Sequence, residues 1–178
     1  MSGNGTGNGD EARATVSVAL SPDDAFRIFT QEVNLWWRRG RRFRNAPGDA
    51  GIVCIEPGPG GRLFESFDTP DGERVVEMGR TKVWDPPRRL VLGWRAANFA
   101  PHEETEVEVL FKPVGAATHV TVVHRGWAAL RADHPVRHGQ PVPAFLRTMG
   151  LWWGDQLTAL RLAAAGVPMA TPPDRRQE

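Results

Sequence analysis

Several residue types and patterns are scarce or missing in this sequence of 178 residues, and each absence removes a class of protein. No run of 18 apolar residues occurs, which argues against a transmembrane helix. The single cysteine, Cys54, allows neither an internal disulfide nor, by itself, a zinc site. The first residues lack the basic start and the apolar stretch of a secretory signal. We therefore expect a cytoplasmic protein in a reducing, bacterial setting.

Motifs for metal, nucleophilic and phosphate chemistry are also missing. The sequence contains no Gly-x-Ser-x-Gly, no His-Glu-x-x-His and no phosphate-binding loop. His119 and His124 are five residues apart on an expected strand, so their side chains should point to opposite faces. His134 and His138 have helical spacing, but Pro135 lies between them and argues against a regular helix. We expect no metal, no cofactor and no catalytic nucleophile.

The charges nearly cancel, because 22 basic and 21 acidic residues give a net charge of +1. Such a chain has no general field for nucleic acid, so we expect no nucleic-acid partner. Tyrosine is absent, whereas there are seven Trp and eight Phe. Tryptophan often lines ligand pockets, although a tryptophan-rich core is the simpler alternative.

Composition predicts one domain between two short terminal segments. Residues 1–12 are rich in Gly, Asn and acidic residues, and residues 168–178 are interrupted by proline, so both segments are expected to be disordered. Residues 13–167 contain no internal repeat and no long linker. They are expected to fold as a single unit.

Hydrophobic periodicity predicts an α+β fold. A strand over 14–20 precedes Ser21-Pro22-Asp23-Asp24, which is typical of a helix start. A short helix and a second one around Trp36 should follow, and then antiparallel strands over 52–56, 62–67, 73–84, 89–96, 104–111 and 118–124. A long helix is expected from about Pro143 to Ala165. A sheet of about seven strands must curl, and only the last helix is long enough to cover its concave face.

The order of several short motifs resembles the SRPBCC superfamily, also called START-like or Bet v-like helix-grip proteins. The likeness is greatest to bacterial homologues of the C-terminal domain of the heat-shock protein 90 ATPase activator. It covers residues 14–165. The motifs are Ser21-Pro22 with Ala25-Phe26, Trp36-Trp37, Pro70-Asp71-Gly72, Gly79, Asp85-Pro86-Pro87, Arg89-Leu90, Trp94, Thr118 to His124, Gly126-Trp127, and Trp153 with Leu157 and Leu160. The resemblance implies a helix-grip fold and, in the wider superfamily, an apolar ligand held between helix and sheet.

Our first functional hypothesis is a binding protein for a hydrophobic or aromatic small molecule. We predict a pocket lined by Trp37, Phe67, Trp94, His124, Trp127, Met149 and Trp153. His124 shares a strand face with Val120 and Val122 and would supply a polar contact. A filled core is the alternative for each tryptophan, and a hydrogen-bonded core residue is the alternative for His124. Glu65, Glu77 and Arg95 are weaker candidates, because a register change of one residue would turn them outward.

Two other functions remain open. An enzyme of the cyclase or aromatase kind would use the same cavity, with His124 and Glu65 as acid and base. A protein-interaction module, including a homodimer or a co-chaperone-like protein, would use exposed loops. One such loop contains Arg38, Arg39, Arg41, Arg42 and Arg44, a set that suits an anionic ligand or an acidic partner. The other is the polar stretch 128–140, which we expect to form a lid or an interface.

Overall fold

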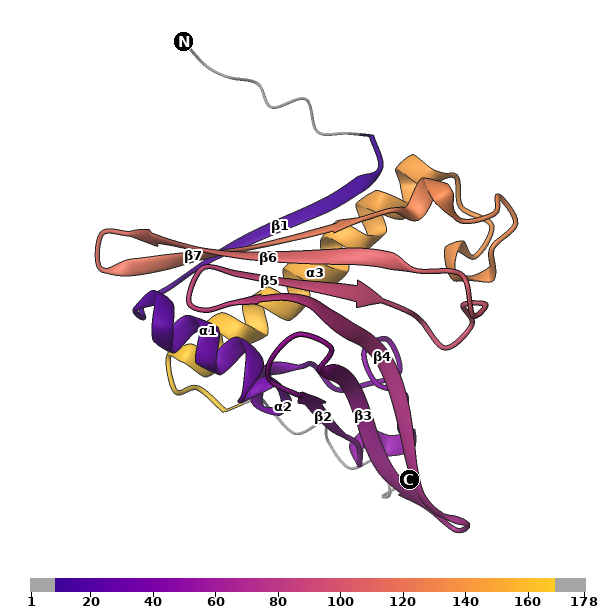
Figure 1. Ribbon diagram of the computed structural model, residues 1–178, viewed down its shortest axis with the longest axis horizontal. Helices are drawn as coiled ribbons and strands as arrows, with labels where there is room; N and C mark the ends of the chain where they lie inside the picture. Colours follow the sequence, from indigo (N-terminus) through magenta and orange to yellow (C-terminus); the bar gives the residue numbers. More distant parts are fainter. Residues whose placement is uncertain (1–8, 169–178) are drawn as a thin grey trace, which may run out of the picture.

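The computed structural model describes residues 9–168 and contains one antiparallel sheet, one long helix and two short helices (Figure 1). The strands are β1 (Glu11–Val18), β2 (Ile52–Ile55), β3 (Arg62–Thr69), β4 (Gly72–Asp85), β5 (Arg89–Trp94), β6 (Thr105–Val114) and β7 (Ala117–Arg125). The helices are α1 (Pro22–Thr30), α2 (Val33–Trp36) and α3 (Val142–Ala164). Residues 1–8 and 169–178, which make up most of the two predicted terminal segments, lie outside the described residues.

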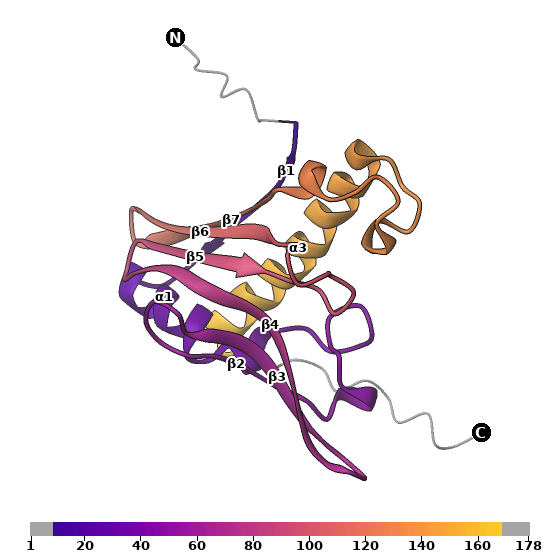
Figure 2. The same cartoon turned by 45° about the vertical axis from the view of Figure 1, so that its right-hand side comes forward.

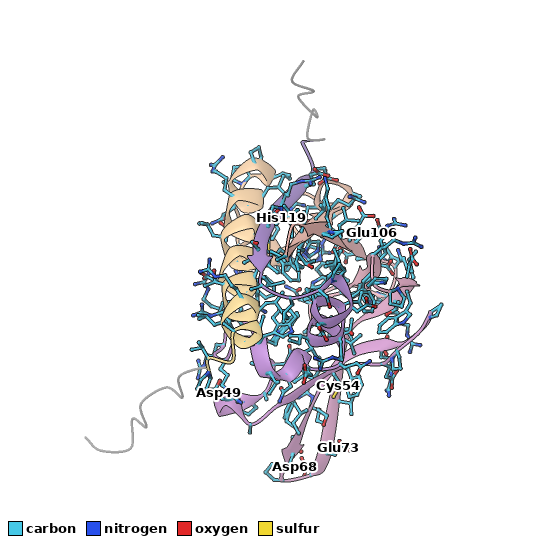
Figure 3. The ribbon with its side chains drawn as sticks, turned by 90° about the vertical axis from the view of Figure 1, so that its left-hand side faces the viewer. Asp49, Cys54, Asp68, Glu73, Glu106 and His119 are labelled. Atoms are coloured by element: carbon cyan, nitrogen blue, oxygen red, sulfur yellow. The ribbon has the colours of Figure 1, made fainter. Side chains whose placement is uncertain are left out.

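The sheet curls around α3, so the predicted α+β helix-grip fold is confirmed (Figures 1 and 2). Its seven strands have the order β1-β7-β6-β5-β4-β3-β2. Each strand from β2 to β6 pairs with the next one along the chain, and β1 pairs with β7. Helix α3 packs against β1, and side chains fill the space between this helix and the sheet (Figure 3).

Alternation of apolar and charged residues determines which sheet face is buried. In β6, Val107, Val109 and Phe111 point into the core, as the sequence predicts. Glu106 and Glu108 alternate with them and point outward, where both accept hydrogen bonds from Arg125. A strand with one buried face and one hydrated face needs this period of two residues.

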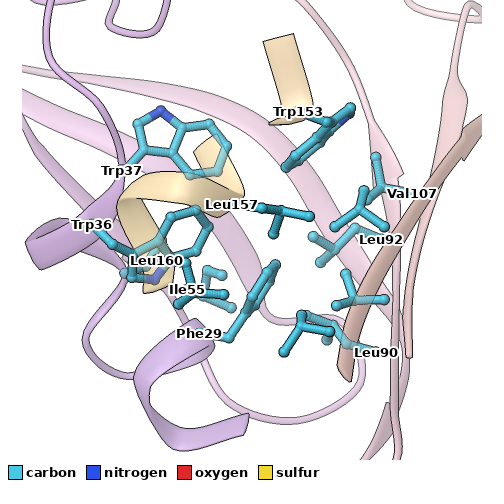
Figure 4. Close-up of a cluster of buried hydrophobic side chains, with 14 of the residues drawn as sticks. Phe29, Trp36, Trp37, Ile55, Leu90, Leu92, Val107, Trp153, Leu157 and Leu160 are labelled. Atoms are coloured by element: carbon cyan, nitrogen blue, oxygen red, sulfur yellow. The ribbon is translucent and has the colours of Figure 1, made fainter. Parts of the chain in front are cut away.

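Helix α3 buries one stripe of large side chains. Trp153, Leu157 and Leu160 recur at intervals of four and three residues and are all buried. Figure 4 shows them facing Leu90, Leu92 and Val107 of the sheet, together with rings from the two short helices. Burial of this stripe positions α3 over the concave face and brings Trp153 close to the ends of β5 and β7.

The first strand begins earlier than its apolar pattern suggests. It starts at Glu11, whereas periodicity predicts a start at residue 14. Glu11 pairs with Arg125 and Ala12 pairs with His124, and Ala12 is buried. These two residues therefore join the sheet, although their composition resembles that of the segment before them.

The stretch 128–140 packs on a second, small core at one end of α3. Buried apolar side chains of this core are Phe99, Trp127, Leu130 and Phe145. Arg137 is buried there and donates to the carbonyl groups of Leu130 and Arg131. His134 Nε2 lies 2.8 Å from Glu103 Oε2. Two polar side chains of this stretch, Arg137 and His134, are therefore buried, and the hydrogen bonds of Arg137 join parts of the loop to one another.

Candidate functional site

Three tryptophans from separate elements meet between α3 and the sheet. Trp37 follows α2, Trp94 ends β5 and Trp153 lies on α3. The ring centroids are 6.0 Å apart for Trp37 and Trp94, 6.2 Å for Trp37 and Trp153, and 5.9 Å for Trp94 and Trp153. All three side chains are buried. At these distances the rings pack directly on one another, so their buried parts form core.

Two protein partners bind the ring nitrogens of His124. The indole Nε1 of Trp153 donates to His124 Nδ1 over 3.1 Å. Nδ1 is therefore the acceptor, and Nε2 carries the proton and donates to Thr105 Oγ1 over 2.8 Å. The Thr105 hydroxyl in turn donates to the carbonyl of Trp94. This chain of hydrogen bonds joins β5, β6, β7 and α3 through one imidazole.

Burial also sets the charge of His124. The side chain is fully buried, and desolvation lowers its pKa from 6.5 to about 3. The imidazole is therefore neutral at physiological pH. With both nitrogens engaged, His124 orients Trp153 and offers no nitrogen to a ligand.

The remaining predicted pocket residues lie in different places. Trp127 contacts the His124 ring, with centroids 4.4 Å apart, but belongs to the second core around Phe99. Met149 is half-buried and packs against both cores. Phe67 is buried on β3, opposite Arg74 on β4, and does not belong to the tryptophan cluster.

A hollow of about 170 Å³ opens at the edge of this cluster. We call it the arginine–tryptophan hollow. Its walls are Trp37, Arg41, Arg42, Phe43, Arg44, Asn45, Met78, Trp94, Arg95, Ala96, Ala97 and Trp152. The lining thus combines large rings with several guanidinium groups, and among these residues there is no carboxyl or imidazole group.

Sequence reasoning missed Trp152, which forms one wall of the hollow. Its ring is half-buried, and its centroid lies 5.4 Å from Phe43, 5.9 Å from Trp37 and 6.1 Å from Trp94. Its indole Nε1 donates to the Arg42 carbonyl over 2.8 Å. Periodicity places Trp153 on the buried stripe, and Trp152 lies about 100° further around the helix. Trp152 becomes part of the hollow because the loop 38–44 packs against its ring.

The five predicted arginines separate into structural and exposed groups. Arg44 is buried and donates to the carbonyls of Trp37, Arg38 and Gly51 and to the Asn34 side chain. Arg39 donates to the Asp49 carbonyl. Arg38 lies over the Phe43 ring, 5.4 Å from its centroid. Arg41 and Arg42 are exposed and line the hollow.

Glu65 fixes the loop that carries these arginines. Its carboxylate is fully buried and accepts hydrogen bonds from the Asn45 amide at 2.6 Å, the Asn45 side chain at 3.0 Å and the Ala46 amide at 3.2 Å. A side chain at Gly51 would overlap this carboxylate, which explains the glycine there. Of the weaker candidates, Glu65 therefore points inward as a loop anchor, and Glu77 is exposed.

Other kinds of site are not found in residues 9–168. No group of three or more His, Cys, Asp or Glu residues in this part of the chain is arranged to hold a metal ion. Burial raises the pKa of the half-buried Cys54 thiol, so this cysteine is a poor nucleophile at neutral pH. Within the same residues, no helix is both long and apolar enough to cross a membrane.

Comparison with solved structures supports the fold. A protein from Nitrosomonas europaea aligns with a TM-score of 0.60 and 14% identity over 90% of this chain and 97% of its own. An HSP90 activator from Plasmodium falciparum aligns with a TM-score of 0.59 and 15% identity, over 89% of this chain and 98% of its own. The Aha1 dimer protein from Colwellia psychrerythraea aligns with a TM-score of 0.57 and 13% identity, over 86% of this chain and 95% of its own. At identities this low, the TM-scores establish a common fold.

Among curated proteins the sequence has no match. A family profile, in contrast, matches residues 19–149, which is well over half of the chain and includes every strand after β1. The resemblance drawn from the sequence motifs is thereby confirmed. The protein belongs to the family of activator of Hsp90 ATPase homolog 1-like proteins.

Proposed function

We propose that the protein binds a small aromatic anion in the arginine–tryptophan hollow. The observation that carries this proposal is the pairing of aromatic walls with uncompensated positive charge. Arg41, Arg42 and Arg95 all line the hollow, and none of them forms an ion pair with a carboxylate in the described part of the chain. An incoming carboxylate would be their counter-ion.

The size of the hollow limits the ligand. A volume of about 170 Å³ is close to that of an engineered apolar cavity of ~150 Å³ that binds benzene. One aromatic ring with a short anionic arm therefore fits the hollow, whereas a sterol-sized ligand would need the interior volume that the three packed indoles occupy. The ligand ring would lie against Trp94 and Trp152, with its anionic group toward Arg42 and Arg95.

Binding is favoured over catalysis by the chemistry of the lining. A cyclase or aromatase needs positioned groups that transfer protons at neutral pH. His124 is neutral with both nitrogens engaged, and Glu65 holds the loop through its hydrogen bonds. Neither residue lines the hollow. The groups that do line it suit recognition of charge and of a planar ring.

Phenylacetate, which has one aromatic ring and a short anionic arm, is a suitable probe, compared with its neutral amide. In calorimetric titrations at low ionic strength, we expect the acid to bind at least about tenfold more tightly than the amide, because only the acid pairs with arginine. Arg42→Gln should weaken binding of the acid by about tenfold. Arg88→Gln, which changes an exposed arginine at the β4–β5 turn, should leave it unchanged.

Equal affinity for the acid and the amide would contradict the charge requirement, and no binding of either at millimolar concentration would contradict the site. Mass spectrometry of the purified protein, first native and then denatured, provides an independent measurement. We expect a bound mass of one-ring size that is lost on denaturation. A retained ligand of sterol size would contradict the assignment to this hollow.

A further inference from the structure

The β3–β4 hairpin extends beyond the rest of the sheet (Figure 2). Strand β4 runs from Gly72 to Asp85, but its pairing with β5 begins only at Gly79. Within the described residues 9–168, residues 72–78 therefore have β3 on one side and no strand on the other. In an antiparallel pair, backbone groups of alternate residues point away from the partner strand. Within this stretch, residues 73–77 present donors and acceptors on that side without a strand partner, which is a template for a further strand.

A groove of about 630 Å³ lies along this free edge. Its lining comes from β4, the end of β5 and the loop that follows β5: Arg74, Val75, Val76, Glu77, Gly79, Arg80, Gly93, Arg95, Ala96, Ala97, Phe99 and Glu104. Val75 is 46% exposed, which is unusual for a valine in the middle of a strand. The small side chains of Ala96 and Ala97, from the loop after β5, also line the groove. The groove therefore lies next to the part of β4 that has a partner strand on one side only.

The charge of the groove favours an acidic partner. Both glutamates of its lining are already neutralised, Glu77 by Arg80 at 2.6 Å and Glu104 by Lys82. Arg74 and Arg95 form no ion pair with a carboxylate among the described residues. Arg95 instead donates to the carbonyls of Ala100 and Pro101, which hold its guanidinium in place and leave its charge uncompensated. The free backbone edge therefore has one fixed positive charge beside it, that of Arg95, and one exposed positive charge, that of Arg74.

We propose that an acidic peptide segment in extended conformation binds here by adding a strand to β4. The bound strand would continue the line of β5, since Arg95 N already donates to Met78 O at the point where β5 leaves the sheet. Main-chain hydrogen bonds to residues 73–77 would supply affinity, and Arg74 and Arg95 would select acidic side chains. The proposal does not rest on the small-molecule function, although residues 95–97 line both this groove and the arginine–tryptophan hollow.

The test uses a fluorescein-labelled ten-residue peptide of alternating Glu and Val, with a Lys-Val peptide of the same length as the charge control. Fluorescence anisotropy at low salt should show binding of the acidic peptide only. Arg74→Glu should weaken this binding by at least about tenfold, because it removes one charge and introduces the opposite one. Lys112→Glu makes the same change in net charge at an exposed position of β6 outside the groove and should have no effect.

Two further measurements separate strand addition from simple charge attraction. An acidic peptide N-methylated at its central residues should lose binding, because its main chain no longer donates hydrogen bonds. Hydrogen exchange should show new protection of amides within residues 73–77. Equal binding of the Lys-Val peptide, undiminished binding to Arg74→Glu, or protection confined to β1 or β2 would each overturn the proposal. Arg42 lines the arginine–tryptophan hollow and not the groove, so Arg42→Gln should leave peptide binding unchanged. The two proposals can therefore be contradicted separately.

Discussion

Replacement of Trp153 with alanine is expected to lower the free energy of unfolding by about 3–5 kcal/mol, the usual cost of truncating a buried large ring. Trp153 is fully buried and contacts Trp37, Trp94 and Trp152. The truncation leaves a cavity that rigid neighbouring rings are poorly able to fill. It also removes the donor to His124 Nδ1 and leaves this acceptor buried without a partner.

Urea denaturation followed by circular dichroism measures this change. Trp153→Phe keeps most of the ring but not the indole donor, so we expect an intermediate loss. Leu151→Ala is the matched control, because Leu151 lies two residues away on α3 and is 72% exposed. Its effect should stay within about 0.5 kcal/mol. A loss of less than about 1 kcal/mol for Trp153→Ala would contradict the packing of the cluster.

This expected loss has a consequence for studies of function. A Trp153 variant that failed to bind a ligand would reveal nothing about the ligand, since the fold itself would be damaged. Arg42 is better suited for testing ligand binding, because its side chain is exposed. Its backbone carbonyl accepts from Trp152, and its guanidinium lies over the Phe43 ring, 5.6 Å from the centroid. A substitution of the Arg42 side chain therefore changes the charge of the hollow with little effect on the core.

The fold was predictable because local patterns and the long-range arrangement agree. In β6 the alternation of glutamate with apolar residues determines the buried face, and the stripe of α3 determines which helix face meets the sheet. Ser21 accepts from the Asp24 amide, as the capping pattern predicts. Such signals depend on neighbours two to four residues away. They can be read from the sequence without knowledge of tertiary contacts.

The candidate site was less predictable because its contacts join distant parts of the chain. The pattern around His124 correctly places it on a buried face, but its partners lie 19 and 29 residues away. Arg44 resembles its exposed neighbours in the sequence, yet it becomes buried because Glu65 and several carbonyl groups surround the same loop. No periodicity distinguishes one arginine of this loop from the next.

The many tryptophans suggested a lined cavity, and the same number of rings explains why the buried region is filled instead. Trp37 and Trp94 stack with an interplanar angle of 21°, and Trp153 meets both edge to face. Such pairs are favourable contacts between rings. The three rings therefore pack against one another in the interior of the fold. At the edge of the cluster, where Trp152 meets the loop 38–44, the half-buried Trp152 ring leaves aromatic surface for the proposed ligand.

Acid is expected to destabilise the fold through His124, by about 2 kcal/mol between pH 6.5 and pH 5. The pKa of this group is about 3 in the folded protein and 6.5 in the unfolded chain. Between these values the unfolded chain binds one more proton than the folded one. The contribution of neutral His124 to stability is therefore complete above pH 6.5 and is lost as the pH falls, at about 1.4 kcal/mol per pH unit.

Urea denaturation at intervals from pH 7 to pH 5 measures this slope. His124→Gln retains an acceptor and a donor but does not titrate, so it should lose the slope whatever its stability at pH 7. His119→Gln removes the half-exposed histidine of the same strand and should retain the contribution of His124. Glu56, whose pKa is lowered to about 2 by hydrogen bonds from Arg62, responds only at more acidic pH. A His124→Gln variant with the slope of the parent protein would mean that the imidazole is not sealed from water between Trp153 and Thr105.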